Sequence, residues 1–189
     1  FFFCFFCLVV YYIFFVLFVS VFVSNQLYPQ DTLIVHPISF DTPSPIGWVA
    51  QYDVKVEFPR VDKTWRKILM KQTLKCDPRT NADKYDCGEW DYIWDALIFI
   101  TVNDTVEAYK LGSFVTPYGK RLEMGGEKGW EWVYDLTDYA PLLRGKKRLH
   151  IGNNQELLDL KFEFIEGVPA RNPISIQNIY SLGEYDGHY

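Results

Sequence analysis

The stretch Trp90–Val102, WDYIWDALIFITV, decides the fold. Every second side chain in it is apolar, whereas the intervening positions carry the acidic residues Asp91 and Asp95 near its start. Alternation with a period of two is typical of a β-strand that has one face against a core. The polar pair Asn103 and Asp104 follows, and Thr105–Val115 continues as another strand. The pattern predicts an antiparallel hairpin with its turn at the polar pair.

Further short β-like runs lie on both sides of this hairpin. Prolines, glycines and polar turns separate them, and no segment after residue 24 keeps helical periodicity for ten residues. About eight such runs predict an all-β fold, an antiparallel β-sandwich or jelly roll. Beyond the hairpin, we expect an edge strand at Leu33–Val35, strands at Trp48–Phe58, Lys67–Leu74, Trp130–Leu136, Arg148–Ile151 and Leu158–Ile165, a helical turn within Asp138–Gly145, and at Ile174–Leu182 either a last strand or the start of a connection onward.

Residues 1–24 are expected to be a hydrophobic export segment or membrane anchor. Residues 1–24 comprise 22 apolar residues, two serines and no charge, which is long enough to span a bilayer. A secretory signal and an uncleaved signal anchor both place residues 25–189 outside the cytoplasm, secreted or periplasmic, with membrane contact only through residues 1–24. The proline-rich residues 25–46 are expected to be a linker with the edge strand, residues 47–168 the jelly-roll domain, and residues 169–189 a connection toward a second domain.

Charge and cysteine usage exclude several classes. The net charge is −5 without a basic run, so nucleic acid is not an expected partner. Outside the apolar segment the only cysteines are Cys76 and Cys87, which in an exported domain predict a disulfide. Two reduced thiols, or half of a metal site, are the alternatives. No companion Cys/His pair has zinc-ligand spacing, so we expect no metal and no cofactor.

Carboxylates and aromatic residues are the remaining candidates for chemistry. Glu89, Asp91 and Asp95 cluster around the start of the decisive strand, and neighbouring carboxylates can separate each other's pKa values for acid–base work. An acidic loop that is merely solvated is the alternative. Trp65 and Trp130, next to turns, could serve as platforms for a sugar ring or belong to the core. The alternation directs Trp90 and Trp94 toward the core face, and His150 is interpreted as an ordinary strand residue.

Three motifs together resemble one family. The first is a cysteine pair whose second member, Cys87, opens the sequence CGEWDY at residues 87–92. The others are LGSFVTPY at residues 111–118 and VYDLTDYAPLL at residues 133–143. Their order and spacing resemble the N-terminal domain of bacterial peptide-N-glycosidase F, from about Thr32 to Ile165. The resemblance implies two eight-stranded jelly-roll domains side by side. It also implies an amidase that hydrolyses the bond between an asparagine side chain and the first N-acetylglucosamine of an N-linked glycoprotein or glycopeptide.

The resemblance assigns roles residue by residue. The family's catalytic aspartate falls on Asp91, with the preceding Trp90 shaping the site, and Glu89, Tyr92 and Asn154 are expected to contact substrate. The family's bridge before this motif falls on the cysteine pair at 76 and 87. Tyr92 stands where the well-studied enzyme has an arginine. The family's supporting glutamate falls on Asn154, leaving Glu156, two residues later, as the candidate substitute.

Two functional hypotheses follow. In the first, this chain is the aspartate-bearing half of an N-glycan amidase and is inactive alone, because a further glutamate and much of the glycan-binding wall belong to the second domain C-terminal to it. In the second, it is a non-catalytic extracytoplasmic β-sandwich that binds glycan or protein. The replacement at Asn154 favours the second hypothesis.

Overall fold

The computed structural model describes residues 31–43, 50–60, 62–75, 93–115, 129–153 and 157–179. Contacts along the chain separate two units, Phe1–Asp31 and Thr32–Tyr189, and every described residue except Asp31 belongs to the second. The expected export segment, residues 1–24, lies outside the described residues. Within the described ranges, no helix has the length and apolar character that crossing a bilayer requires.

The described residues form eight β-strands and one short 3-10 helix. Apart from the run that begins at Ile174, each strand predicted within these ranges falls on a strand of the structure, with the ends adjusted by a few residues. The elements are β1 (Thr32–Ile38), β2 (Ala50–Phe58), β3 (Trp65–Lys75), β4 (Ile93–Val102), β5 (Thr105–Val115), β6 (Trp130–Asp135), η1 (Thr137–Tyr139), β7 (Gly145–Asn153) and β8 (Leu157–Glu166).

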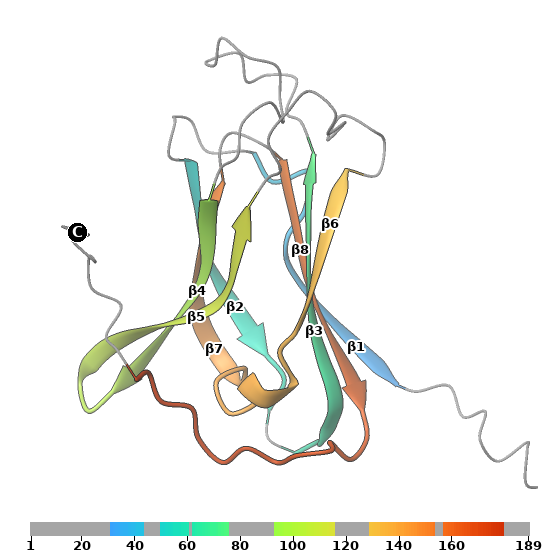
Figure 1. The fold of residues 1–189 in the computed structure, drawn as a ribbon, viewed down its shortest axis with the longest axis vertical. Coiled ribbons are helices and arrows are strands. Elements are labelled where there is room, and N and C mark those ends of the chain that lie inside the picture. The colour runs from blue at the N-terminus through green and yellow to red at the C-terminus, as the bar shows by residue number, and fades with distance from the viewer. Residues whose placement is uncertain are drawn as a thin grey trace, which may run out of the picture. The chain divides into compact units, whose positions relative to one another are not determined.

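The strands make two four-stranded antiparallel sheets that face each other (Figure 1). Sheet A has the order β1-β8-β3-β6 and sheet B the order β2-β7-β4-β5. Apart from the β4–β5 hairpin, successive strands lie in opposite sheets, so the chain crosses the sandwich repeatedly. This order is that of an eight-stranded jelly roll. The predicted fold class, an all-β antiparallel sandwich, is therefore confirmed.

The hairpin at the centre of the prediction has a two-residue turn. Val102 pairs with Thr105, and the turn residues Asn103 and Asp104 have φ angles of 49° and 63°. Positive φ at both central positions defines a type I′ turn, whose twist matches that of the flanking strands. Asparagine and aspartate tolerate this left-handed backbone better than other non-glycine residues.

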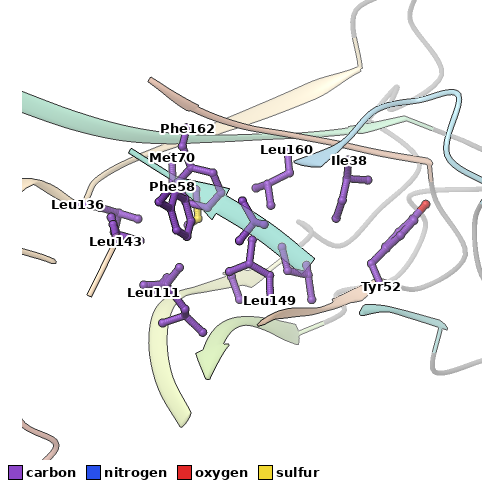
Figure 2. Packing of buried hydrophobic residues seen from close by; sticks show 14 of the residues in the cluster. Ile38, Tyr52, Phe58, Met70, Leu111, Leu136, Leu143, Leu149, Leu160 and Phe162 are labelled. Carbon is purple, nitrogen blue, oxygen red and sulfur yellow. The ribbon is translucent and has the colours of Figure 1, made fainter. Parts of the chain in front are cut away.

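The core lies between the inward faces of the two sheets. In β3 every second residue from Ile68 to Leu74 is buried. Phe58 of sheet B packs edge-on against Phe162 of sheet A, with ring centroids 5.0 Å apart (Figure 2). Side chains buried completely between the sheets include Phe58, Phe114, Phe162, Phe164, Ile38, Ile68, Met70, Leu74, Ile98, Leu136 and Leu143. Their close packing fixes how the sheets face each other.

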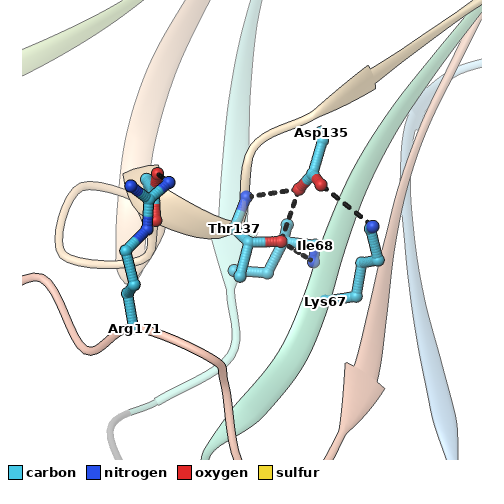
Figure 3. Close-up of polar contacts among 6 residues, drawn as sticks. Lys67, Ile68, Asp135, Thr137 and Arg171 are labelled. Atoms are coloured by element: carbon cyan, nitrogen blue, oxygen red, sulfur yellow. Dashed lines mark hydrogen bonds and ion pairs between the residues drawn. The ribbon is translucent and has the colours of Figure 1, made fainter.

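A polar network joins sheet A to η1 (Figure 3). The Thr137 hydroxyl donates to Asp135 Oδ1 at 2.5 Å and accepts the backbone N–H of Ile68 at 3.1 Å. Lys67 Nζ lies 3.0 Å from Asp135 Oδ2. The motif at residues 133–143 therefore ends β6 and turns the chain toward β7. The predicted helical turn at residues 138–145 is realised as η1, slightly earlier in the chain.

The segment after β8 crosses the end of the sandwich (Figure 1). Its described part, up to residue 179, contains no strand. Ile176 packs against the core, and the Asn178 side chain donates a hydrogen bond of 2.9 Å to the carbonyl of Ala108 in β5. The segment runs from sheet A to sheet B across the strand ends, so it cannot extend a ladder along an edge.

Candidate functional site

The strand ends on either side of the predicted site segments lie at one end of the sandwich. We call this end, which includes residues 50, 75, 93, 115, 153 and 157, the loop end. β3, β5 and β7 finish there, and β2, β4, β6 and β8 begin there (Figure 1). Register places these ends side by side, with pairs Ala50–Asn153, Lys75–Leu157 and Ile93–Val115. Sites carried by loops on a rigid scaffold are common in proteins. The loop end is therefore where the strands that flank the predicted functional segments come together.

The predicted site residues themselves lie outside the described residues. They are the predicted catalytic pair Asp91 and Glu156, the predicted substrate contacts Glu89, Trp90, Tyr92 and Asn154, and the cysteines Cys76 and Cys87. The described structure brings together the strands that carry them. β4 begins two residues after Asp91, and its neighbour β7 ends one residue before Asn154.

β4 and β7 approach each other closely near the loop end. A Cβ atom built on Gly152 of β7 would lie 2.9 Å from the Cβ of Trp94 in β4. That separation is shorter than folded proteins show, and both atoms lie close to the backbone, so neither can turn away. Glycine at position 152 therefore permits the spacing of these two strands.

Five aromatic side chains join the two sheets below the loop end. Trp94 stacks on Phe114 at 5.8 Å between ring centroids, and both belong to sheet B. Trp132 of sheet A meets Trp94 edge-on at 5.8 Å, and Tyr134 packs on Phe114 at 4.8 Å. Trp130 continues the row at 6.3 Å from Trp132. Aromatic pairs in these geometries add stability beyond burial alone, so the cluster holds the sheets together beneath the candidate site.

The tryptophan predictions have different outcomes. Trp94 faces the core with 5% of its surface exposed, as the alternation predicted. Trp130 lies at the start of β6, at the loop end, and is 43% exposed. Trp65 lies at the opposite end of its strand and packs against Phe164 at 5.2 Å. Of the two candidate sugar platforms, only Trp130 is close to the loop end.

Two buried polar side chains, one in each sheet, have no hydrogen-bond partner among the described residues. The Gln72 side chain is fully buried, and neither its oxygen nor its nitrogen finds a hydrogen bond there. The buried indole N–H of Trp94 likewise finds no hydrogen-bond partner among the described residues. Buried polar groups in proteins are nearly always hydrogen-bonded to protein or water.

Asp95 is held in a structural contact. Its Oδ1 accepts the Ser113 hydroxyl at 2.6 Å, and its Oδ2 lies 2.8 Å from Lys110 Nζ. Both carboxylate oxygens therefore bond to β5, across the hairpin. The sequence had grouped Asp95 with Glu89 and Asp91, but in the structure it fastens β4 to β5.

The outer face of sheet B carries a second polar cluster. Arg148 donates from Nε to both Asp53 oxygens, at 2.8 and 3.0 Å, and its guanidinium lies 4.6 Å from the Phe99 ring centroid. The hydrogen bond from Arg148 lowers the pKa of Asp53 below its ordinary value. His150 Nδ1 lies 3.5 Å from Asp53 Oδ2, and its ring packs edge-on against Phe99 at 6.4 Å.

Sequence reasoning missed this cluster because its members lie on three strands. Asp53 and His150 are register partners on β2 and β7, and Phe99 pairs with Arg148 across β4 and β7. Only the strand order and register bring them together. Similarly, Asp159 of β8 is 7% exposed and is bonded by His36 of β1 at 2.8 Å. Among the described residues, no group of three His, Cys, Asp or Glu side chains has the arrangement of a metal site.

The described strands define an eight-stranded jelly roll, and the predicted site residues adjoin strand ends at one end of it. Among solved structures, the chain is similar to one described as recombinant peptide N-glycanase F (PNGase F). That alignment has 22% identity and a TM-score of 0.56, and it covers 75% of this chain and 44% of that one. A second structure, a peptide-N(4)-(N-acetyl-β-D-glucosaminyl) asparagine amidase, aligns with 23% identity and a TM-score of 0.52, covering 74% of this chain and 44% of that one.

These likenesses confirm a fold of the PNGase F kind, as the resemblance implied. At such identities they concern the fold alone. This chain spans less than half the length of either structure. No family model matches the chain. No curated protein matches it either.

Proposed function

We propose that this chain is the aspartate-bearing half of an amidase that releases N-linked glycans from glycoproteins, and that it acts with a second domain C-terminal to it. The observation that carries the proposal is the PNGase F-like fold, with the Glu-Trp-Asp motif immediately before β4. The gathering of strand ends at one end of the sandwich supports it further, because the segments that hold Asp91 and Asn154 are attached to neighbouring strands.

The proposed reaction is an amide hydrolysis. Water adds to the carbonyl carbon of the glycosylated asparagine, the C–N bond breaks, and the nitrogen leaves on the sugar as a glycosylamine. The peptide keeps an aspartate, and the glycosylamine then loses ammonia to water. The reaction needs a base that takes a proton from water, and groups that stabilise the developing negative charge on oxygen.

We assign Asp91 as the base that activates the water. Glu156 is the candidate second carboxylate, in place of the glutamate that Asn154 replaces. Trp90 offers an apolar face to the sugar, and Glu89, Tyr92 and Asn154 offer polar groups to its hydroxyls. A disulfide between Cys76 and Cys87 would restrict the conformational freedom of the segment that carries Asp91. Mass spectrometry of the unreduced and reduced protein tests that bond separately.

The test uses this chain together with the sequence that follows it in its gene. A denatured N-glycoprotein is the substrate, and the readouts are free glycan and the conversion of asparagine to aspartate in the peptide. We expect release by the native sequence and none by Asp91→Asn, with Asp95→Asn as the matched control that retains activity. Failure of the native protein to release any glycan would contradict the proposal.

A binding module is the second candidate, and the asparagine at position 154 favours it. It would hold an N-glycan or a protein without cleaving it. A stop codon directly after Tyr189 would favour this function, and a following β-rich domain with acidic residues would favour the amidase. Retention on a glycan array without glycan release would identify the binding function, and the absence of retention would rule out glycan binding.

A further inference from the structure

β4 and β7 are hydrogen-bonded to each other along only part of their length, and they diverge toward the end of sheet B opposite the loop end. Their pairing runs only from Ala96–Ile151 to Phe99–Arg148. Beyond that point β4 pairs with β5 as far as Val102, and β7 pairs with β2 as far as Gly145. The divergence opens a groove of about 780 Å³, which we call the β4–β7 groove. Its size lies in the range of small-ligand sites, which is about 300–1,000 Å³.

The β4–β7 groove is remote from the candidate catalytic segment. It is lined by the distal halves of β2 and β4, by Val106 of β5 and by the first half of β7. Its charged and aromatic lining residues are Lys55, Glu57, Phe99, Lys146, Lys147 and Arg148. At about 3.3 Å per residue, Ile100 lies roughly 23 Å along β4 from Ile93, where the strand begins at the loop end. The groove is thus a separate feature of the fold.

Positive charge dominates the groove. Arg148 is matched by Asp53, to which it is hydrogen-bonded, and is held against Phe99. Among the described residues, Lys55, Lys146 and Lys147 form no ion pair. Glu57 is the acidic residue among those that line the groove. Three cations facing one anion are notable on a chain whose net charge is −5.

Unneutralised cations beside an apolar wall favour an organic anion. Charge-assisted hydrogen bonds from lysine are stronger than neutral ones, and a recess screens them less than an open surface does. The exposed Val106 and the half-buried Phe99 and Ile100 offer apolar contact, and the hydroxyl of Thr101 can bond a sugar hydroxyl. This combination fits a ligand with charged groups on a compact, partly apolar frame.

We infer that the β4–β7 groove binds an acidic sugar chain through its carboxylate or sulfate groups. The inference that the ligand is a carbohydrate rests on the proposed function. The inference that the ligand is an anion rests on the lysines alone. The groove then holds a charged part of a glycan at a distance from the loop end, outside the site of bond cleavage.

The test measures the binding of defined probes to the full chain by titration calorimetry, at low salt and in a mild non-ionic detergent. The probes are sialyllactose, which carries a carboxylate, a sulfated heparin tetrasaccharide, and neutral lactose. We expect at least one acidic sugar to bind about tenfold or more tightly than lactose, and its affinity to fall as salt rises. Lys146→Gln/Lys147→Gln should weaken binding at least about tenfold, because the loss of a single charge-assisted contact already has an effect of that size.

The matched control is Lys63→Gln/Lys67→Gln, which removes the same charge from the β2–β3 connection and from sheet A. It should leave affinity unchanged. Equal weakening by the control, equal binding of lactose, or no binding of either acidic sugar would overturn the inference. So would a single-stranded DNA oligonucleotide that binds as tightly as the sulfated sugar, because the groove would then accept any polyanion.

Two further measurements separate this inference from misfolding and from the proposed amidase. The amide NMR signals of Thr101 and Val106 should shift on addition of the acidic sugar, and their failure to move would contradict binding at the groove. Asp91→Asn should bind the sugar as the native chain does. Binding without glycan release would then refute only the amidase, and release without binding would refute only the groove.

Discussion

The phenol of Tyr134 on β6 donates a hydrogen bond of 2.6 Å to the backbone carbonyl of Ser113 on β5. β6 is an edge of sheet A and β5 an edge of sheet B, so this bond closes one side of the sandwich. The Ser113 hydroxyl in turn donates to Asp95 on β4, which continues the connection into sheet B. The side of the jelly roll below the loop end is therefore fastened by polar as well as aromatic contacts.

Removing the Tyr134 hydroxyl should destabilise the contact between β6 and β5. Tyr134→Phe keeps the ring packing on Phe114 but loses the bond to Ser113, and we expect the free energy of unfolding to fall by about 1 kcal/mol. Guanidinium unfolding measures the change. Tyr139→Phe, at a half-buried tyrosine of η1, is the control and should have a smaller effect. Equal losses in the two variants would contradict a specific role for this bond.

Glycine 152 should be more sensitive to substitution than glycine 112. A Cβ on Gly152 would meet Trp94 Cβ at 2.9 Å, and one on Gly112 would meet the Tyr134 ring at 3.2 Å. The ring of Tyr134 can shift by a few tenths of an ångström, whereas Trp94 Cβ moves only with its backbone. We expect Gly152→Ala to destabilise the fold by about 1–3 kcal/mol, in the range of overpacked cores, and Gly112→Ala by less. The reverse order in chemical denaturation would refute this explanation.

The hairpin turn should respond to residues that favour or resist positive φ. Asp104→Gly creates the Asn-Gly pair preferred in type I′ turns and should raise stability by a few tenths of a kcal/mol, because glycine adopts positive φ without strain. Asp104→Val should lower stability by about 1–2 kcal/mol, since a β-branched residue resists the left-handed region. Thermal unfolding measures both. Thr101→Val, on the adjoining strand, controls for the general effect of an added apolar residue.

Acid should weaken the network around Thr137. The hydrogen bond from the Thr137 hydroxyl, assisted by Lys67, lowers the pKa of Asp135. Because the folded pKa is lower than the unfolded one, the unfolded chain binds more protons between the two values, so this stabilisation is present above about pH 4 and is lost as pH falls through the folded pKa. The stability advantage of the native protein over Asp135→Asn should therefore shrink below about pH 4. A difference independent of pH would contradict it.

Much of this architecture could be predicted from alternation alone. The runs around Tyr52–Phe58 and Leu158–Phe164 place apolar residues at every second position, and the structure buries that face because a sandwich has one wet and one dry side per sheet. In the run Ile68–Leu74 the buried face also includes the polar Gln72. The predicted terminal run at Ile174 failed as a strand in its described part because the fold carries that segment across the strand ends.

The candidate site was only partly accessible to such reasoning. The sequence identified the segment around Asp91 through its motif, but it could not say that β7 is the neighbour of β4. It grouped Asp95 with the candidate acids, whereas register pairs Asp95 with Ser113 and uses it to join two strands. It treated His150 as ordinary because periodicity does not reveal which residue lies opposite.

By itself, the sequence determined which residues form strands, which face of each strand is apolar, and where the type I′ turn falls, because these depend on neighbours one to three positions away. Only the tertiary structure decided the strand order, the closure of the sandwich by Tyr134 and Ser113, and the divergence of β4 from β7 that leaves Lys146 and Lys147 beside an open groove. Those features depend on pairing between residues far apart in the chain, which many registers could satisfy locally and only packing of the whole core selects.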